Sequence, residues 1–156
     1  MNKLKFLMRG EFPDNKIDYT SLTTLDMLYD VFFSDISIVI NSVSFDYKNG
    51  SDVNMPILDF LWSLSYVISD INEGIKDTEI EITESNLSYK FSKDEDYLIV
   101  SCNWSSMKER ILYSEFKKIA MEFINQVFHS LEVKCISITR NINYTDLKNT
   151  ILSRLH

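Results

Sequence analysis

Apolar residues at spacings of three and four predict a helix between Pro56 and Gly74, the strongest such pattern in the chain. The apolar positions that share one face of this helix are Ile57, Phe60, Leu61, Leu64, Ile68 and Ile71. Pro56 suits a first helical turn because its missing N–H would have no partner there, and Gly74 suits the left-handed residue after the last turn. Trp62, Tyr66 and Val67 widen the apolar surface, which indicates a helix packed between a sheet and another element.

A second apolar stripe predicts another long helix later in the chain. Its members are Leu112, Phe116, Ile119, Ala120, Phe123, Val127 and Leu131. Ser106 and Glu109 form a capping box for an early start, whereas Ser114 would cap a later one and leave Lys108 to Tyr113 as a strand. The later start is preferred, because the early one gives a helix well above the mean length of about 11 to 12 residues.

Apolar and polar residues alternate in the segment after the first helix, as in strands with one exposed face. Three such runs, Asp77 to Thr83, Leu87 to Ser92 and Tyr97 to Trp104, follow one another with joints short enough for hairpins. The pattern predicts an antiparallel meander with one solvated face. In the first run Glu79 and Glu81 take the polar positions, so carboxylates are expected on that exposed face.

The first third of the chain contains two further strand patterns. Lys3 to Phe12 is interpreted as a strand ended by Pro13. Asp35 to Tyr47 is rich in β-branched residues, and Asn41-Ser42 within it permits a tight hairpin, although a single unbroken strand fits nearly as well.

Three shorter elements complete the secondary structure. Thr20 or Ser21 could cap a short helix before the hairpin, and Val133 to Thr139 resembles a further strand. Thr145 is expected to cap a terminal helix whose inward residues are Leu147, Ile151 and Leu155.

These elements predict an α+β fold in which an antiparallel sheet, a meander plus a hairpin, is covered on one face by two main helices. The helices are those over 56–73 and 114–131, and a C-terminal helix is added to them. A chain of 156 residues fits one domain, 1–156, and contains no repeat or linker that would divide it.

The chain shows no apolar run near the ~18 residues that span a bilayer. The amino-terminal apolar patch is broken at Arg9 and Glu11, which disfavours a signal peptide. A cytoplasmic protein without membrane contact is therefore expected, with Cys102 and Cys135 reduced and buried rather than paired.

Charge is distributed unevenly along the chain. The formal net charge is −7, and residues 70–96 carry nine acidic and three basic side chains, whereas residues 105–156 carry five acidic and eight basic ones. An acidic middle region repels nucleic acid and attracts a basic protein, although it also suits a well-hydrated surface without a partner. We expect no direct nucleic-acid binding.

The sequence lacks the residues that most kinds of catalytic site require. The three glycines, at 10, 50 and 74, cannot form a phosphate-binding loop. His129 has no second metal-ligand residue at suitable spacing, and it is the only plausible histidine base for a nucleophile. The segment DYKNGSDVNM superficially suggests a calcium loop, but aligning Gly50 puts Phe45, Tyr47 and Pro56 at ligand positions.

Glu79 and Glu81 could in principle hold a cation or act as acid and base, and a small carboxylate- or metal-dependent enzyme stays open as an alternative. Carboxylates two apart on a strand more often form a solvated face. We therefore expect no enzyme and no cofactor. The other alternative is a scaffold subunit without inhibitory activity.

The remaining interpretation is a protein-binding module, a monomer or weak dimer, that uses its acidic residues to contact a basic partner. Tyr89 and Tyr97 flank the acidic hairpin and are candidate aromatic anchors, unless they simply pair across strands. The full set of predicted contact residues is Asp77, Glu79, Glu81, Tyr89, Asp94, Glu95, Asp96 and Tyr97.

The order of these elements resembles that of the small single-domain immunity proteins of bacterial toxin systems, including contact-dependent growth inhibition. The segments that carry the resemblance are the leading strand, ISIVINSVSF, PILDFLWSLSYVI, the acidic meander and SEFKKIAMEFINQVF. The resemblance implies a cytoplasmic protein that binds one cognate toxin and neutralises it, often by occluding a basic nuclease site. It assigns no functional residue by position.

Overall fold

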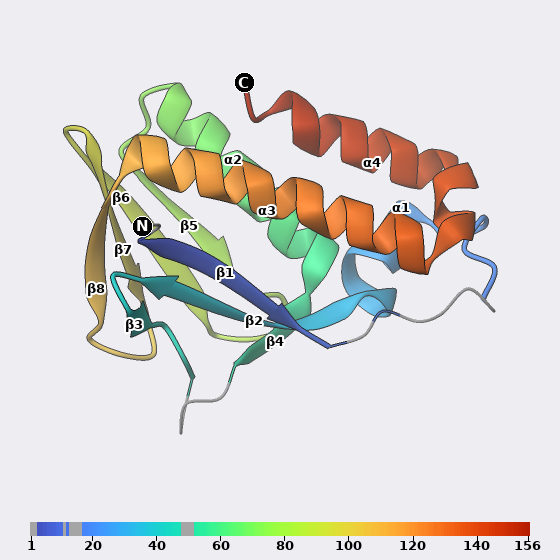
Figure 1. Cartoon of the computed structure of the whole chain (residues 1–156), viewed down its shortest axis with the longest axis horizontal. Coiled ribbons are helices and arrows are strands. Elements are labelled where there is room, and N and C mark those ends of the chain that lie inside the picture. The colour runs from blue at the N-terminus through green and yellow to red at the C-terminus, as the bar shows by residue number, and fades with distance from the viewer. Residues whose placement is uncertain (1–2, 11, 13–16, 48–51) are drawn as a thin grey trace.

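A computed structural model describes residues 3–10, 12, 17–47 and 52–156 and shows an α+β fold (Figure 1). Over these residues the strands form two separate antiparallel sheets of four strands each, where the sequence suggested one sheet. The calcium-loop-like segment lies partly outside the described residues. Within the described residues, no helix has the length and hydropathy needed to cross a membrane.

Sheet A is built around β2 (Phe33–Ile40), which pairs with β1 (Leu4–Arg9) along one edge. The other edge of β2 pairs with β3 (Val43–Ser44) and β4 (Val53–Pro56). The predicted hairpin at Asn41-Ser42 is confirmed. These two residues have φ angles of 52° and 68°, as the tight turn of a two-residue hairpin requires.

Sheet B is the predicted meander, in the order β5 (Asp77–Glu81), β6 (Ser88–Asp94), β7 (Tyr97–Cys102) and β8 (Lys108–Leu112). The strand alternative for the segment from Lys108 is thus confirmed. The buried side chains of sheet B alternate with exposed ones along the strands and include Ile80, Phe91, Leu98, Val100 and Ile111.

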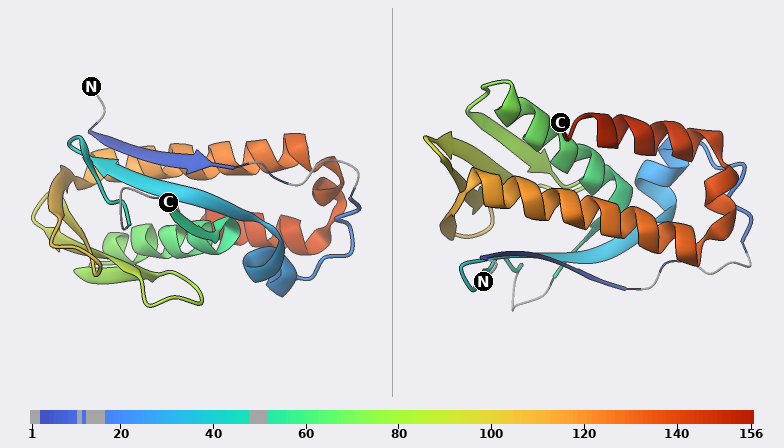
Figure 2. Two further views of the ribbon diagram at one scale, coloured as in Figure 1. Left: turned by 90° about the horizontal axis from the view of Figure 1, so that it is seen from below. Right: turned by 45° about the horizontal axis from the view of Figure 1, so that its top comes forward.

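Two long helices, α2 (Ile57–Asn72) and α3 (Tyr113–Lys134), pack between the sheets and the C-terminal helix α4 (Ile142–Ser153). Figure 2 shows sheet A on one side of these helices, α4 on the other, and sheet B at one end. Phe6 of β1 stacks on Phe123 of α3 with ring centroids 5.0 Å apart, and Phe60 of α2 meets the same ring edge-on. This aromatic contact joins sheet A to both helices.

The ends of α2 and α3 differ slightly from the prediction. Pro56 is the cap residue before α2, and Gly74 has the expected positive φ of 90°. Ser114 does not cap α3, because that helix already begins at Tyr113. The Tyr113 amide instead donates a 2.9 Å hydrogen bond to the carbonyl of Asp96, which ties the start of α3 to the β6–β7 hairpin.

The predictions for two shorter elements are wrong. The short helix α1 (Thr24–Asp26) is capped by Thr23, neither by Thr20 nor by Ser21, because Thr23 and Asp26 form a reciprocal capping box. A π-helical turn, η1 (Met27–Val31), continues it. The segment from Val133 to Thr139 is not a strand, since α3 runs on to Lys134 and a 3₁₀ helix, η3 (Ile136–Arg140), follows.

The last helix is capped by Asn141 rather than by Thr145. The Asn141 carboxamide accepts hydrogen bonds from the amides of Asn143 and Tyr144, and it donates to the carbonyls of Tyr19 and Leu22. A buried amide with four partners holds the helix start more firmly than a hydroxyl can. The residues predicted to face inward from the terminal helix, Leu147, Ile151 and Leu155, are buried, although Leu155 lies beyond the end of α4; Cys102 and Cys135 are buried too.

Candidate functional site

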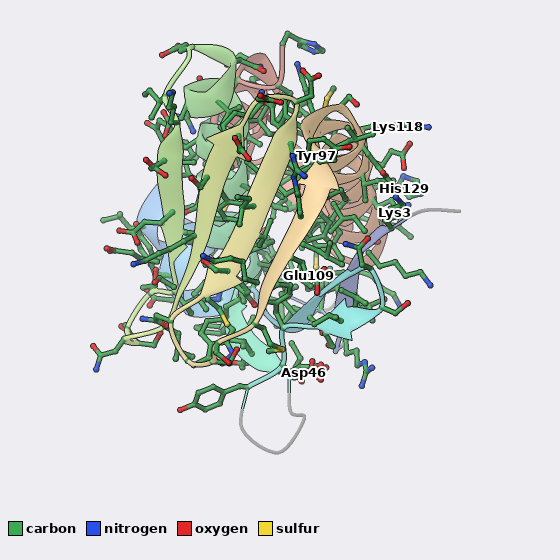
Figure 3. All side chains as sticks on the ribbon, turned by 90° about the vertical axis from the view of Figure 1, so that its left-hand side faces the viewer. Lys3, Asp46, Tyr97, Glu109, Lys118 and His129 are labelled. Atoms are coloured by element: carbon green, nitrogen blue, oxygen red, sulfur yellow. The ribbon has the colours of Figure 1, made fainter. Side chains whose placement is uncertain are left out.

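The outer face of sheet B, which faces the viewer in Figure 3, carries part of the charge of the acidic middle region, residues 70–96. In one row across this face, Glu79 lies opposite Lys90, Lys90 opposite Ser101, and Ser101 opposite Lys108. Asp77, Glu79 and Glu81 are exposed, as predicted. The face is not uniformly acidic, however, because its acids lie on β5 and its bases on β6 and β8.

The β6–β7 hairpin forms a second acidic group at one end of the sheet. Asp94, Glu95 and Asp96 are exposed there, and Glu95 takes a positive φ of 53° in the turn. Tyr97 is half-buried, and the Arg110 guanidinium lies 3.7 Å from its ring centroid. Arg110 also approaches the Asp94 carboxylate at 3.9 Å. Tyr97 and Asp94 are therefore already engaged within the sheet.

Tyr89 is wrongly predicted as a contact residue. Its side chain is fully buried, opposite Ile80 and Cys102 in the ladder, and its ring meets that of Trp104 edge-on at 4.9 Å. Burial raises the pKa of the Tyr89 hydroxyl far above its usual value. The physical reason is the strand alternation, since the register that turns Glu79 and Glu81 outward turns Tyr89 into the core.

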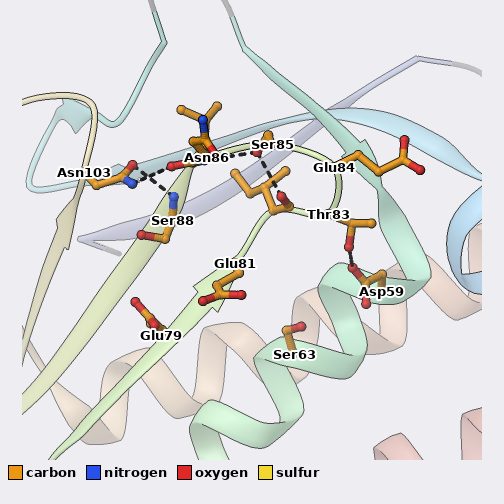
Figure 4. Close-up of a pocket in the computed structure, with 12 residues that line it drawn as sticks. Asp59, Ser63, Glu79, Glu81, Thr83, Glu84, Ser85, Asn86, Ser88 and Asn103 are labelled. Atoms are coloured by element: carbon orange, nitrogen blue, oxygen red, sulfur yellow. Dashed lines mark hydrogen bonds between the residues drawn. The ribbon is translucent and has the colours of Figure 1, made fainter.

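A hollow of about 670 Å³ lies where β5 and α2 diverge, and we refer to it as the acidic hollow (Figure 4). Asp59 and Ser63 of α2 line one side, and Glu79 and Glu81 of β5 line another. The remaining lining residues are Ile82, Thr83, Glu84, Ser85, Asn86, Leu87, Ser88 and Asn103. Four carboxylates thus line the hollow, with no lysine, arginine or histidine among its lining residues.

The rim of the acidic hollow is held by its own hydrogen bonds. Asn103 accepts from the Ser88 amide at 3.0 Å and donates to the Asn86 carbonyl at 2.6 Å, which joins the β5–β6 loop to the end of β7. Ser85 donates to the Ile82 carbonyl within the same loop at 2.9 Å. These bonds fix the shape of the rim without a ligand.

Asp59 is the most enclosed carboxylate of the hollow. It accepts a hydrogen bond from the Thr83 hydroxyl. Burial raises the pKa of Asp59 above its usual range, and the Thr83 hydrogen bond offsets part of that rise. A positive group that enters the hollow would therefore stabilise a carboxylate that the fold itself partly desolvates.

A cluster of aromatic and basic side chains lies on the neighbouring face of α2. The guanidinium of Arg154, the residue directly after α4, lies 3.9 Å from the ring centroid of Trp62 and 3.8 Å from that of Tyr66. Tyr66 is 44% exposed. Tryptophan, tyrosine and arginine are the side chains that most often dominate the energetics of protein interfaces.

The sequence pattern did not single out Asp59, Ser63, Glu84 or the Trp62–Tyr66–Arg154 cluster as site residues. One signal was present, because Asp59, Ser63 and Tyr66 follow one another on the side of α2 opposite its apolar stripe. Arg154 had no such signal, since its contact with α2 joins residues far apart in the chain.

The arrangement suits the binding of basic side chains. Among the described residues, no group of three or more histidine, cysteine, aspartate or glutamate side chains is placed to hold a metal ion. His129, labelled in Figure 3, is exposed on α3 and is not a lining residue of the acidic hollow. Comparison of the chain with protein-family models, with curated proteins and with solved structures finds no match in any of the three.

Proposed function

We propose that this protein is a stoichiometric inhibitor of a basic protein, and specifically an immunity protein that binds and neutralises a cognate toxin. The observation that supports it best is the acidic hollow, whose charged lining residues, Asp59, Glu79, Glu81 and Glu84, are all acidic. Because like charges gathered in one concave site repel each other, such a site gains most from a positively charged occupant.

The surroundings of the hollow add to this argument. Its volume of about 670 Å³ lies within the roughly 300–1,000 Å³ typical of sites that bury a ligand. The acidic hairpin tip at 94–96 extends the negative potential along the sheet, which would accelerate encounter with a basic partner. Tyr66 and Trp62 would supply apolar contact area next to the charges.

The test is co-purification of the tagged protein with partners from its native cell lysate, at low and at high salt. We expect one basic protein in equal amount, released more readily as salt rises, whose toxic activity stops when the complex forms. Replacing Glu79 and Glu81 by glutamine should weaken binding about two- to thirtyfold, since each exposed charge pair contributes roughly 0.2–1 kcal/mol.

Glu122→Gln is the matched control, because Glu122 is an exposed acid on α3 outside the hollow. It should leave binding unchanged. A stable complex whose partner stays fully active would contradict inhibition and favour a scaffold. Enzymatic turnover by the isolated protein, abolished by Glu79→Gln, would instead favour the carboxylate-dependent enzyme.

A further inference from the structure

The two edge strands of sheet B, β8 and β5, differ in what lies beside them. At the β8 edge, the side chain of Asn41, from the hairpin of sheet A, donates to the carbonyl of Arg110 at 3.0 Å and to the Glu109 carboxylate at 3.0 Å. The β5 edge has no strand beside it among the described residues, and Figure 3 shows it at the open side of the sheet.

The backbone groups of β5 that point away from the sheet can be identified from the ladder. The Ile82 amide donates to the Leu87 carbonyl at 2.9 Å, and the Lys93 amide donates to the Lys76 carbonyl at 2.7 Å. Even-numbered residues of β5 therefore direct their N–H and C=O groups toward β6. Since these directions alternate along an antiparallel strand, the groups of Asp77, Glu79 and Glu81 point toward the open edge.

The charges on this edge select what could pair with it. A second copy of the same chain, paired edge to edge, would bring the carboxylates of Glu79 and Glu81 against those of its neighbour, which destabilises a sheet. A strand with lysine or arginine on that face would place opposite charges side by side. The edge is therefore protected against self-association yet open to a basic strand.

The space beside the edge is bounded by α2. Thr78 donates a 2.9 Å hydrogen bond to Asp70, and Thr83 donates to Asp59, so both ends of β5 are tied to this helix. The acidic hollow opens at the Glu81 end of the strand, where Asp59 and Ser63 face Glu81 (Figure 4). An added strand would thus have Glu79 and Glu81 along one face and the hollow at one end.

We propose that β5 accepts an extended basic segment of the partner protein as an added strand of sheet B. The backbone of that segment pairs with Asp77, Glu79 and Glu81, and its lysine or arginine side chains lie against the carboxylates of β5 and the acidic hollow. This inference rests on the proposed function for the identity of the partner, but the strand pairing itself can be tested without it.

The first test compares two substitutions at one position. Glu79→Gln removes the charge only, whereas Glu79→Pro also removes an amide that is not needed for the β5–β6 ladder. If the partner adds a strand, Glu79→Pro should weaken binding of the co-purified partner by about tenfold beyond Glu79→Gln, the loss expected for one intermolecular hydrogen bond. Equal affinities of the two variants would overturn the strand pairing.

The second test uses the unmodified protein and a synthetic twelve-residue peptide of alternating lysine and valine. Hydrogen exchange followed by NMR should slow at the amides of Asp77, Glu79 and Glu81, while the amides of Thr78 and Ile80 keep their exchange rates. A peptide with glutamate in place of lysine should give no protection. Absence of protection at the three outward amides, or equal protection throughout sheet B, would overturn the inference.

The two proposals fail in distinguishable ways. Protection of the outward amides by the peptide, without any basic partner from the lysate, would support the added strand and contradict the proposed inhibitor function. A basic partner that the protein neutralises, and that binds the Glu79→Pro and Glu79→Gln variants with equal affinity, would support the inhibitor function and contradict the added strand.

Discussion

The two edges of sheet B show two ways of protecting a strand. The β8 edge is closed by a hydrogen bond from Asn41 to the Arg110 carbonyl, and the exposed face beside it carries Lys108 and Arg110. The β5 edge keeps its outward backbone groups uncovered by any other described strand and relies on carboxylates. A hydrogen-bonded cap makes the capped group unavailable to any added strand, whereas a charge excludes only partners of the same sign. The difference indicates that β5, not β8, is the edge available for binding.

The largest effect is expected from proline substitutions at adjacent positions of β5. Ile80→Pro should lower the free energy of unfolding by roughly 3–6 kcal/mol, because Ile80 is buried and its amide belongs to the ladder. Glu79→Pro should cost only about 1 kcal/mol, because its amide points toward the open edge. Urea denaturation of both variants measures the difference.

Similar losses in the two proline variants would contradict the assigned direction of the β5 backbone. Glu79→Ala and Ile80→Ala are the controls, because they separate the loss of each side chain from the loss of its amide. The excess effect of proline over alanine should be large at Ile80 and small at Glu79.

Much of sheet B could be predicted from the sequence, because alternation is a local property. The meander, the outward direction of Glu79 and Glu81, and the inward direction of Ile80 all follow from period-two patterning. Tyr89 follows the same pattern and lies inside. It was predicted to be a surface contact because it is aromatic, against the direction that the alternation indicates.

The contacts that distinguish the two edges could not be predicted in this way. Asn41 closes the β8 edge from another sheet, 69 positions from Arg110. The acidic hollow likewise depends on how α2 packs against β5. At Val133 to Thr139 the β-branched pattern was misleading, since α3 extends through Val133 with its side chain exposed.

The next largest effect is expected at the closed edge. Asn41→Gly removes the side chain that donates to Arg110 and Glu109 but permits the φ of 52° at this turn position. Loss of these hydrogen bonds should lower the free energy of unfolding by about 1 kcal/mol, a fall of roughly 2–4 °C in the melting temperature. Calorimetry of the purified variant measures it.

Ser42→Gly is the matched control, because Ser42 has a φ of 68° in the same turn. It should be neutral or slightly stabilising, since glycine relieves the cost of a positive φ. If Asn41→Gly were equally harmless, the Asn41 side chain would not be what closes the β8 edge.

A smaller, pH-dependent effect is expected at the open edge, where Asp59 lies in the acidic hollow. Burial raises the pKa of Asp59 above its ordinary value of 3.8, so the protonated form favours the folded state. That contribution is fully present below pH 3.8 and is lost as the pH rises through the raised pKa. Asp59→Asn should therefore stabilise the protein at pH 7, and its advantage should shrink as the pH falls toward 3.8.

Urea denaturation of the parent protein and of Asp59→Asn at several pH values between 3.5 and 7 measures this advantage. Asp77→Asn is the control, because Asp77 is an exposed acid of β5, outside the acidic hollow, that accepts a hydrogen bond from Ser92. A stabilisation of Asp59→Asn that is the same at every pH would contradict the role of the charge. A gain at neutral pH would mean that this carboxylate is kept at some expense of stability, as binding sites often require.

The smallest change in stability is expected from exchanging charges within one row of the outer face. Glu79→Lys and Lys108→Glu alter opposite ends of the row that runs through Lys90 and Ser101, and each should change the free energy of unfolding by no more than about 0.5 kcal/mol. Their effects on binding of the lysine–valine peptide should differ, because only Glu79 adjoins the open edge. Glu79→Lys should weaken that binding, and Lys108→Glu should leave it equal or slightly stronger. Opposite effects of equal size would mean that the net charge of the whole face attracts the peptide, so the contrast between the two edges would no longer explain recognition.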